Sequence, residues 1–166
     1  MSDDDVPPGK NRADSICVMT EFVLPSHTNA YGTIFGGTVM GWVDLCAAVT
    51  AQRHAGRACV TAFVDDLLFE GPVRAGEVVR LEGCITATFR TSMEVEVIVR
   101  GENTLTGRTW PCVRALLTFV ALDDARKPTP VPKVLLESDA HRCMQRDAEE
   151  RRARRLQGRN PSSNRA

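Results

Sequence analysis

The feature that most constrains the fold is a proline-free apolar segment that runs from Thr38 to about His54. It follows the pair Gly36-Gly37, and Gly56 stands where a helix of this length would end. Apolar residues occur all the way round the helical wheel of this segment, and a helix that is apolar on every side is buried on every side. We therefore expect a central helix that the rest of the domain surrounds.

A single acidic residue, Asp44, interrupts this apolar segment. The residues one helical turn before and after it are mostly small and leave space beside the carboxylate; they are Met40, Gly41, Ala47 and Ala48. A buried carboxylate is costly unless it is paired or has a chemical role, so two interpretations stay open, a structural carboxylate and a functional one. The aspartate and the glycines of the segment argue against a membrane-spanning helix.

Composition narrows the class of protein. A chain of 166 residues suits one domain with tails. The 21 basic and 21 acidic residues give a formal net charge of zero, so nothing draws the whole protein towards nucleic acid or a membrane surface. The sequence starts without a basic and apolar leader, which predicts no signal peptide. The six cysteines include no C-x-x-C pair, which predicts reduced thiols in a cytoplasmic protein rather than a zinc site or a redox motif.

Alternating and β-branched segments predict five strands, one before the helix and four after it. They cover residues 16–24, 58–64, 78–89, 93–100 and 108–122, and residues 65–69 either continue or bend the second of these strands. A hairpin loop is expected at residues 103–107, and Pro111 predicts an edge or a bulge near the start of the last strand. An antiparallel sheet that curls round the apolar helix would hide it, which predicts an α+β domain over residues 15–135.

The two flanks of this domain differ in composition. Residues 1–14 are rich in aspartate and proline and are predicted to be disordered. Residues 136–166 predict a charged helix, with Ser138 as N-cap and a body from Ala140 to Gln157, followed by a tail. The apolar stripe of this helix is thin, which favours a solvated surface helix, and a helix that braces subunits or binds a partner is the alternative.

The segment Asn29-x-x-Gly-x-Ile-Phe-Gly-Gly-x-x-Met-x-Trp-Val-Asp44 resembles the signature of the acyl-coenzyme A thioesterases of the YciA and cytosolic acyl-CoA hydrolase group. Four later segments are similar to that family in order and spacing: His54-Ala-Gly, Val60-Thr-Ala-Phe-Val-Asp-Asp66, Gly76-Glu-Val-Val and Arg90-Thr-Ser-Met-Glu-Val-Glu-Val97. The resemblance covers about residues 16–135. It implies the hotdog fold, in which an antiparallel β-sheet wraps around a long central helix.

The resemblance also implies an activity, the hydrolysis of acyl-CoA to a free acid and coenzyme A, with no cofactor and no metal. Asp44 matches the family's catalytic aspartate and would act as general base or nucleophile, and Thr61 matches a hydroxyl residue that orients the water or the carboxylate. Gly37, in the first helical turn, would polarise the thioester carbonyl through backbone N–H groups. Thr33 stands where relatives carry the Asn or Asp that complements the catalytic aspartate across the dimer.

The family further implies which residues contact the substrate. The turn Arg90-Thr91-Ser92-Met93 matches the segment that contacts the nucleotide and the pantetheine arm, and Arg90 is a candidate for the phosphates. The remaining candidates for substrate contacts are Asn29, Gly36 and Arg57. The preferred acyl chain length stays open, because it depends on the depth of a tunnel.

Two other functions stay open. A hotdog domain can bind acyl-CoA as a sensor or scaffold without turnover, although a pure binder gains nothing from a buried acid. A hydratase or dehydratase of this fold needs a histidine beside the aspartate, whereas His27, His54 and His141 are expected outside the helix core. An isolated curled sheet leaves an open edge and half an active site, so we expect a homodimer as the minimal unit and a hexamer of three dimers.

Overall fold

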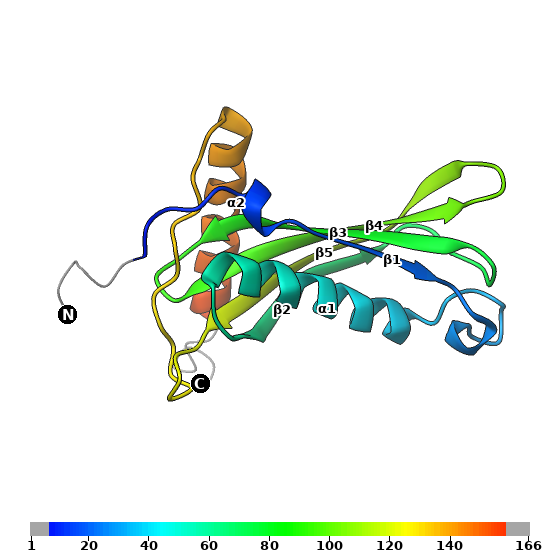
Figure 1. Ribbon diagram of the computed structural model, residues 1–166, viewed down its shortest axis with the longest axis horizontal. Helices are drawn as coiled ribbons and strands as arrows, with labels where there is room; N and C mark the ends of the chain where they lie inside the picture. Colours follow the sequence, from blue (N-terminus) through cyan, green and yellow to red (C-terminus); the bar gives the residue numbers. More distant parts are fainter. Residues whose placement is uncertain (1–6, 159–166) are drawn as a thin grey trace, which may run out of the picture.

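The computed structural model describes residues 7–158. Five antiparallel strands form one sheet in the order β1-β3-β4-β5-β2, and two helices lie on its opposite faces (Figure 1). The strands are β1 (Cys17–Phe22), β2 (Cys59–Phe69), β3 (Val78–Thr88), β4 (Ser92–Asn103) and β5 (Arg108–Ala121). The helices are α1 (Gly36–Ala55) and α2 (Asp139–Gly158), with two short 3-10 helices, η2 (Ala13–Ser15) and η3 (Pro25–His27). The predicted α+β architecture and all five strands are confirmed.

The helix α1 forms the core together with the inner face of the sheet. One side of α1 is fully buried against strand residues such as Leu81, Val95 and Phe119. Gly83 on β3 permits this close approach, because a Cβ there would collide with the hydroxyl of Thr50. The helix ends at Gly56, whose φ of 66° is left-handed and whose N–H donates to the carbonyl of Gln52 at 2.8 Å. The helix therefore has the bounds that the sequence predicted.

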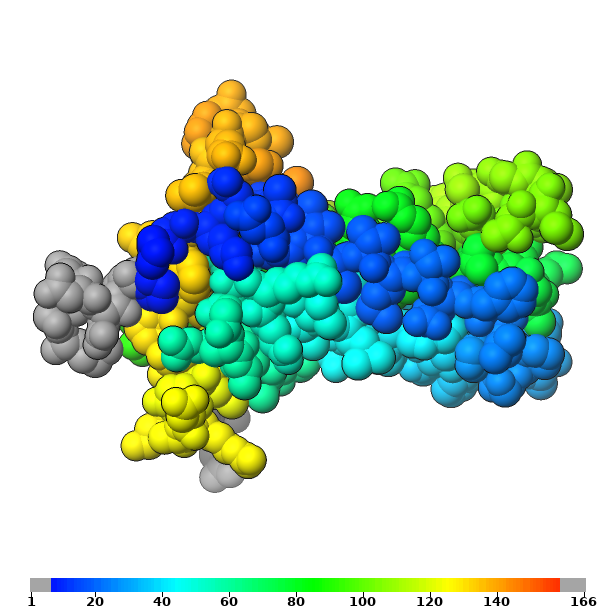
Figure 2. Space-filling view, in the orientation of Figure 1, coloured from blue at the N-terminus to red at the C-terminus, as the bar shows by residue number. Residues whose placement is uncertain are grey.

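The expectation that α1 is buried on every side is wrong for the single chain. Met40, Leu45 and Val49 are 47%, 56% and 36% exposed, and α1 is visible at the surface of the molecule (Figure 2). The physical reason is that the five-stranded sheet of one chain covers only one side of the helix. An apolar stripe of α1 is therefore left without a cover in the described chain.

The strand β2 forms an edge of the sheet and is irregular. It pairs with β5 alone, and the pairing shifts register at Ala62 and again at Asp65, which face no partner residue on β5. Large apolar side chains stand exposed along this strand, namely Val60, Phe63, Val64, Leu68 and Phe69. The pairing of β4 with β5 is also irregular between Val99 and Arg100, opposite Pro111, which confirms the bulge predicted at that proline.

The N-terminal segment does not match the prediction of disorder over residues 1–14. Lys10 donates its N–H to the carbonyl of Lys133 at 2.9 Å and bridges to Val134, and Arg12 is only 9% exposed. Residues 7–14 are held because the extended segment after β5 offers a backbone partner, which composition does not reveal. Residues 1–6 lie outside the described residues.

The helix α2 begins as predicted, because the Oγ of Ser138 accepts the N–H of His141 at 3.2 Å. Most residues of α2 are exposed, as expected of a surface helix, but the helix is also attached to the sheet by side chains. Arg151 and Arg155 reach carboxylates on the outer face of the sheet, and Ala148 is fully buried. The predicted tail at 159–166 lies outside the described residues. Within the described part of the chain, no helix is both long and apolar enough to cross a bilayer.

Candidate active site

Asp44 lies midway along α1 and is bonded to Thr61. The Oγ1 of Thr61 donates to the Oδ1 of Asp44 at 2.6 Å, which joins the central helix to the third residue of β2. Asp44 is half-buried rather than buried as predicted, because its neighbours Met40 and Gly41 are exposed on the uncovered stripe of α1. A carboxylate held on one oxygen and open on its other side can accept a proton from a water molecule or attack an acyl carbon.

Asn29 occupies the loop between η3 and α1. Its Oδ1 accepts the N–H of Tyr31 at 2.9 Å and the N–H of Thr33 at 3.3 Å, which is the side-chain-to-backbone pattern of an Asx turn. Its Nδ2 donates to the Oγ1 of Thr33 at 3.1 Å. The N–H of Phe35 donates to the carbonyl of His27 at 2.8 Å, which ties this loop to the start of α1. Thr33 therefore holds the amide of Asn29 in place.

The start of α1 presents backbone donors. The N–H of Thr38 is the first that donates back along the chain, to the carbonyl of Phe35 at 2.9 Å, and no side chain caps the helix at Phe35. The N–H groups of Gly36 and Gly37 precede this bond at the positive end of the helix dipole. A Cβ on Gly37 would come within 2.5 Å of the Phe35 ring, so this ring would have to shift to admit a larger residue. This end of the helix can stabilise a developing oxyanion.

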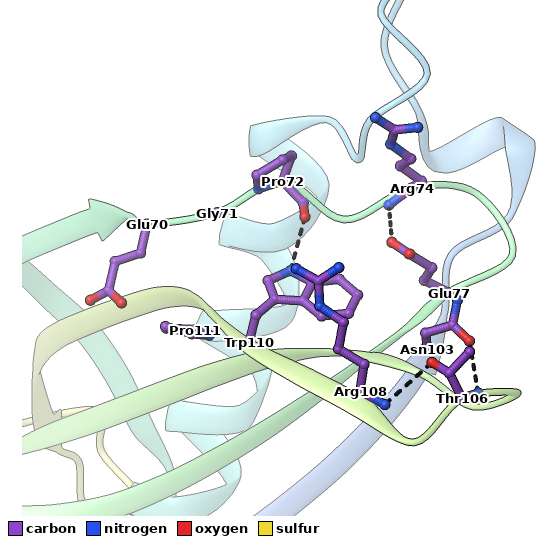
Figure 3. Close-up of a pocket in the computed structure, with 10 residues that line it drawn as sticks. All are labelled: Glu70, Gly71, Pro72, Arg74, Glu77, Asn103, Thr106, Arg108, Trp110 and Pro111. Carbon is purple, nitrogen blue, oxygen red and sulfur yellow. Dashed lines mark hydrogen bonds between the residues drawn. The ribbon is translucent and has the colours of Figure 1, made fainter.

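Two cavities share the segment 70–72 in their walls, and one of them lies beside the start of α1. One, of about 420 Å³, is lined mostly by apolar groups, including Ile34, Val39 and Phe69, and it borders Gly36. The other, of about 730 Å³, is more polar (Figure 3). In this second cavity Trp110 donates its Nε1–H to the carbonyl of Pro72 at 2.9 Å, and the guanidinium of Arg108 lies 5.6 Å from the indole ring centre. The apolar cavity has the chemistry that an acyl chain requires.

The residues expected to bind coenzyme A lie at the far end of the molecule. Arg57 follows the C-terminus of α1, Arg90 and Thr91 lie in the turn between β3 and β4, and Ser92 begins β4. Met93 is fully buried, so its side chain is not available to a bound nucleotide in this chain. The 20 residues of α1 span about 30 Å, which separates this group from Gly36 and Gly37. A single chain therefore gathers its predicted residues into two groups at opposite ends of α1, with Asp44 and Thr61 between them.

His54 lies at the predicted end of the central helix, and the structure shows that it is buried there. His54 belongs to the last turn of α1 and is 1% exposed, with hydrogen bonds to the Oγ of Ser15 at 2.9 Å and the carbonyl of Pro132 at 3.1 Å. Burial lowers the pKa of His54 below its ordinary value, and the positive charge of Lys10 adds to this effect. It lies ten residues after Asp44, so it is not placed to share a substrate with that carboxylate.

Aromatic rings beside the two glycines were missed by sequence reasoning. The ring of Phe35 rests on Gly37, and the ring of Phe69 lies 3.3 Å from the position of a Cβ on Gly36. Phe69 comes from the end of β2, 33 residues away in the sequence. The apolar cavity that it lines could not be inferred, because its walls meet only in the folded chain.

Comparisons with known proteins identify the family. The model of the Thioesterase superfamily matches residues 31–107. An uncharacterised acyl-CoA thioester hydrolase of Bacillus subtilis is 40% identical over 76% of this chain and 73% of its own length. The acetyl-coenzyme A thioesterase of Rattus norvegicus is 35% identical over 89% of this chain, which spans 26% of the length of that relative.

Solved structures agree with these matches. A hexameric acyl-CoA thioesterase superposes with a TM-score of 0.88 at 38% identity, covering 93% of this chain and 99% of its own. An acyl-CoA hydrolase from Staphylococcus aureus, in complex with butyryl coenzyme A, coenzyme A and coenzyme A disulfide, superposes with a TM-score of 0.84 at 36% identity, covering 92% and 93%. These likenesses confirm the predicted hotdog fold. The chain belongs to the acyl-CoA thioester hydrolase family of the thioesterase superfamily.

Proposed function

We propose that this protein is an acyl-CoA thioesterase, which hydrolyses acyl-CoA to a free acid and coenzyme A. The observation that carries the proposal is the pairing of Asp44 with Thr61 at 2.6 Å on a half-open helix face. A pure binding protein gains nothing from a carboxylate that is oriented by a hydroxyl and left open on its other side. The family to which the chain belongs supports the same reaction.

The spacing of three residues supports their roles. Solved structures of the Staphylococcus aureus enzyme include variants in which an asparagine, an aspartate and a threonine are each replaced by alanine. Those three residues are separated by 15 and 17 positions, as are Asn29, Asp44 and Thr61 in this chain. The sequence suggested that Thr33 complements the catalytic aspartate across the dimer. We therefore assign this role to Asn29 instead. Thr33 then acts by holding the Asn29 amide.

In the proposed reaction, Asp44 either removes a proton from the attacking water or attacks the thioester carbon itself. The N–H groups of Gly36 and Gly37, with the amide of Asn29, stabilise the negative charge that develops on the carbonyl oxygen. The C–S bond then breaks, and the coenzyme A thiolate leaves and takes up a proton. Where Asp44 is the nucleophile, the acyl group stays on it as an anhydride, and a water molecule hydrolyses this anhydride to the free acid and the Asp44 carboxylate. Thr61 keeps the carboxylate of Asp44 oriented throughout.

Two chains are needed for this arrangement. Asp44 lies seven residues after Gly37 on the same helix, which places the two about 10 Å apart along the axis. A carbonyl carbon and its oxygen are bonded, so one thioester cannot reach both groups of the same chain. We therefore propose that the helix start of one chain faces Asp44 of a second chain in a homodimer. The uncovered stripe of α1 and the open edge of β2 are the surfaces that such a partner would cover.

A two-fold axis between the chains would also bring together the predicted substrate residues, which lie at opposite ends of α1 in a single chain. A self-complementary interface runs the two α1 helices in opposite directions, which brings the Arg57 and Arg90 end of one chain beside the Gly37 end of the other. Coenzyme A then extends from the reaction centre along the partner chain towards these arginines. We propose further assembly into a hexamer of three dimers, since relatives of known structure are hexameric. We also propose a cytoplasmic location, as for the cytosolic hydrolase of Rattus norvegicus.

Thiol release from acyl-CoAs of two to eighteen carbons tests this function. Release that rises linearly with enzyme concentration supports the thioesterase. Saturable binding of acyl-CoA with no thiol release would instead favour a sensor or scaffold of the same fold. Hydration of an enoyl-CoA without thiol release would favour a hydratase, which the position of His54 away from Asp44 argues against.

The path of coenzyme A has its own test. Replacement of Arg90 by alanine is expected to raise KM for acyl-CoA about tenfold with little change in kcat, because phosphate contacts are equal in ground and transition states. Acyl-pantetheine, which lacks the nucleotide, should be hydrolysed equally well by both proteins. An equal loss with both substrates would remove Arg90 from the nucleotide path.

A further inference from the structure

A polar cluster lies on the outer face of the sheet, behind the strand that carries Thr61. Asp65, one of the two bulged residues of β2, is held there by the Oγ1–H of Thr118 at 2.9 Å and by an ion pair with Arg155 of α2. The Asp65 side chain is 6% exposed and that of Arg155 is 11% exposed. Bulges of this kind re-aim side chains and are common beside active sites. This cluster takes no part in the chemical steps of the proposed reaction.

The helix α2 spans the sheet from β3 to β2. Gln145 exchanges hydrogen bonds with the backbone of Thr88 on β3, and Arg155 pairs with Asp65 on β2. The ten residues between Gln145 and Arg155 cover about 15 Å of helix, and three strand spacings from β3 to β2 cover about 14 Å. The part of α2 from Gln145 to Arg155 therefore matches the width of sheet that it crosses, and Figure 1 shows α2 running behind the strands.

A second anchor of α2 does not involve β2. Arg151 makes two bonds to Glu94 of β4, at 3.0 and 2.7 Å, and the Oγ1–H of Thr86 donates to the same carboxylate at 2.6 Å. Arg155 is thus the arginine through which α2 reaches β2, where it also lies 5.1 Å from the ring centre of Phe63. Arg151 therefore attaches α2 to β4, and Arg155 attaches it to β2, the strand of Thr61. The two contacts can be removed separately by substitution of one arginine or the other.

We propose that Asp65 and Arg155 are positioning residues for the proposed thioester hydrolysis. Thr61 precedes Asp65 by four residues on an edge strand that pairs with β5 alone in the described chain. With Asp65 fixed from behind, the bulged backbone of β2 keeps the register in which the hydroxyl of Thr61 meets Asp44. Neither Asp65 nor Arg155 touches the substrate, so their effect passes through Thr61. This inference rests on the proposed function.

Replacement of Arg155 by methionine tests the proposal, because it keeps an unbranched side chain over Phe63 and removes the charge. We expect kcat to fall about tenfold or more with KM unchanged, since small misplacement of a catalytic group has effects of this size. Arg155→Lys should recover part of the rate. Two matched controls lie on the same helix: Arg154→Met, at an exposed neighbour, and Arg151→Met, which removes the other anchor and should lower the melting temperature without lowering kcat.

The decisive measurement repeats Arg155→Met in a Thr61→Val background. If Arg155 acts through Thr61, the second substitution should cause no further loss of kcat. Equal losses in both backgrounds, an equal loss in Arg151→Met, or an unchanged kcat in Arg155→Met would each overturn the proposal. Where Arg155→Met does not fold, Asp65→Asn takes its place with the same expectations, since its side chain still accepts the Thr118 hydroxyl.

Amide hydrogen exchange separates this inference from the proposed function. Arg155→Met should speed exchange across residues 59–66 whether or not the protein hydrolyses acyl-CoA, and Arg151→Met should not. Absence of thiol release by the unsubstituted protein would refute the thioesterase activity. The proposal that Arg155 and Asp65 hold β2 in its register would still be tested by amide hydrogen exchange. Unchanged amide exchange of residues 59–66 in Arg155→Met would refute the role of Arg155 in holding β2 but would leave the thioesterase activity untouched.

Discussion

The two helices of this protein have the same length and pack on opposite faces of one sheet, yet they are held by different forces. Both contain 20 residues. The buried side of α1 is almost entirely apolar, with Val39, Val43 and Cys46 pressed against the strands. In α2 the sole fully buried residue among those described is Ala148, and attachment depends on Arg151 and Arg155. Burial of apolar surface therefore holds α1 on the sheet, whereas ion pairs hold α2.

This difference determines how each helix responds to change. Burial of an apolar side chain contributes about 1.5–3 kcal/mol and needs no particular partner. A buried ion pair adds little relative to apolar packing, but removal of one partner costs about 3–5 kcal/mol, because the other charge stays buried alone. Substitutions on α1 should therefore act on the chemistry and the assembly, and substitutions on α2 should act on stability and on the placement of β2.

The largest effect is expected at the reaction centre on α1. Asp44→Asn keeps the shape of the side chain and removes the base or nucleophile, so kcat should fall about a hundredfold or more. Thiol release at saturating acyl-CoA measures this, with the melting temperature as a check of folding. Near-normal turnover in a folded Asp44→Asn protein would remove Asp44 from the reaction.

The next effect concerns the uncovered stripe of α1. Leu45 is 56% exposed in the single chain and would lie in the proposed dimer interface. Leu45→Glu places a charge there and should shift the protein to inactive monomers, as light scattering at micromolar concentration would show. Leu105 is 95% exposed at the tip of the β4–β5 hairpin, so Leu105→Glu is the matched control and should leave the assembly intact. A Leu45→Glu protein that stays oligomeric and active would contradict the interface.

The outer face offers a direct comparison of two ion pairs on β4. Glu94, with a side chain 2% exposed, pairs with Arg151 of α2, whereas Glu96 pairs with the exposed Arg114 of β5. Glu94→Gln should lower the free energy of unfolding by about 3 kcal/mol. Glu96→Gln should cost about 1 kcal/mol or less, because its partner is solvated. Denaturant titration measures both, and equal costs would mean that α2 gains nothing from its buried pair.

The smallest effect is a pH dependence from the end of α1. Burial lowers the pKa of His54 in the folded state below its ordinary value of 6.5, so the unfolded state binds more protons as the pH falls below 6.5. The contribution of His54 to stability is therefore present above pH 6.5 and is lost as the pH falls through the folded pKa. The melting temperature should decline more steeply below pH 6.5 in the unsubstituted protein than in His54→Gln. Parallel curves would mean that His54 does not couple protonation to folding.

The central helix and the strands of the sheet could be predicted from the sequence. The proline-free apolar segment and Gly56 gave the bounds of α1, and alternating patterns gave all five strands. The segment from Asn29 to Asp44 pointed to the family before any contact was known. These features are local, because the hydrophobic periodicity of a helix or strand depends on residues that are close together in the chain.

The register of β2 could not be read in the same way. Its sequence suggests a continuing or bent strand, but the two bulges at Ala62 and Asp65 arise from pairing with β5, some 50 residues later. The meeting of Thr61 with Asp44, and of Asp65 with Arg155, depends on that register. Arg155 stands among several arginines of similar appearance, and nothing near it in the sequence marks the one that finds a buried partner.

The sequence by itself determined the elements, the family and the aspartate at the centre of the apolar helix, since each depends on residues close together in the chain. The tertiary structure decided which side of α1 stays uncovered, where β2 is bulged and how a charged helix attaches to the sheet. It also decided that the predicted site residues divide between the two ends of α1. The physical reason is that burial, register and charge pairing depend on groups that meet only after the chain has folded.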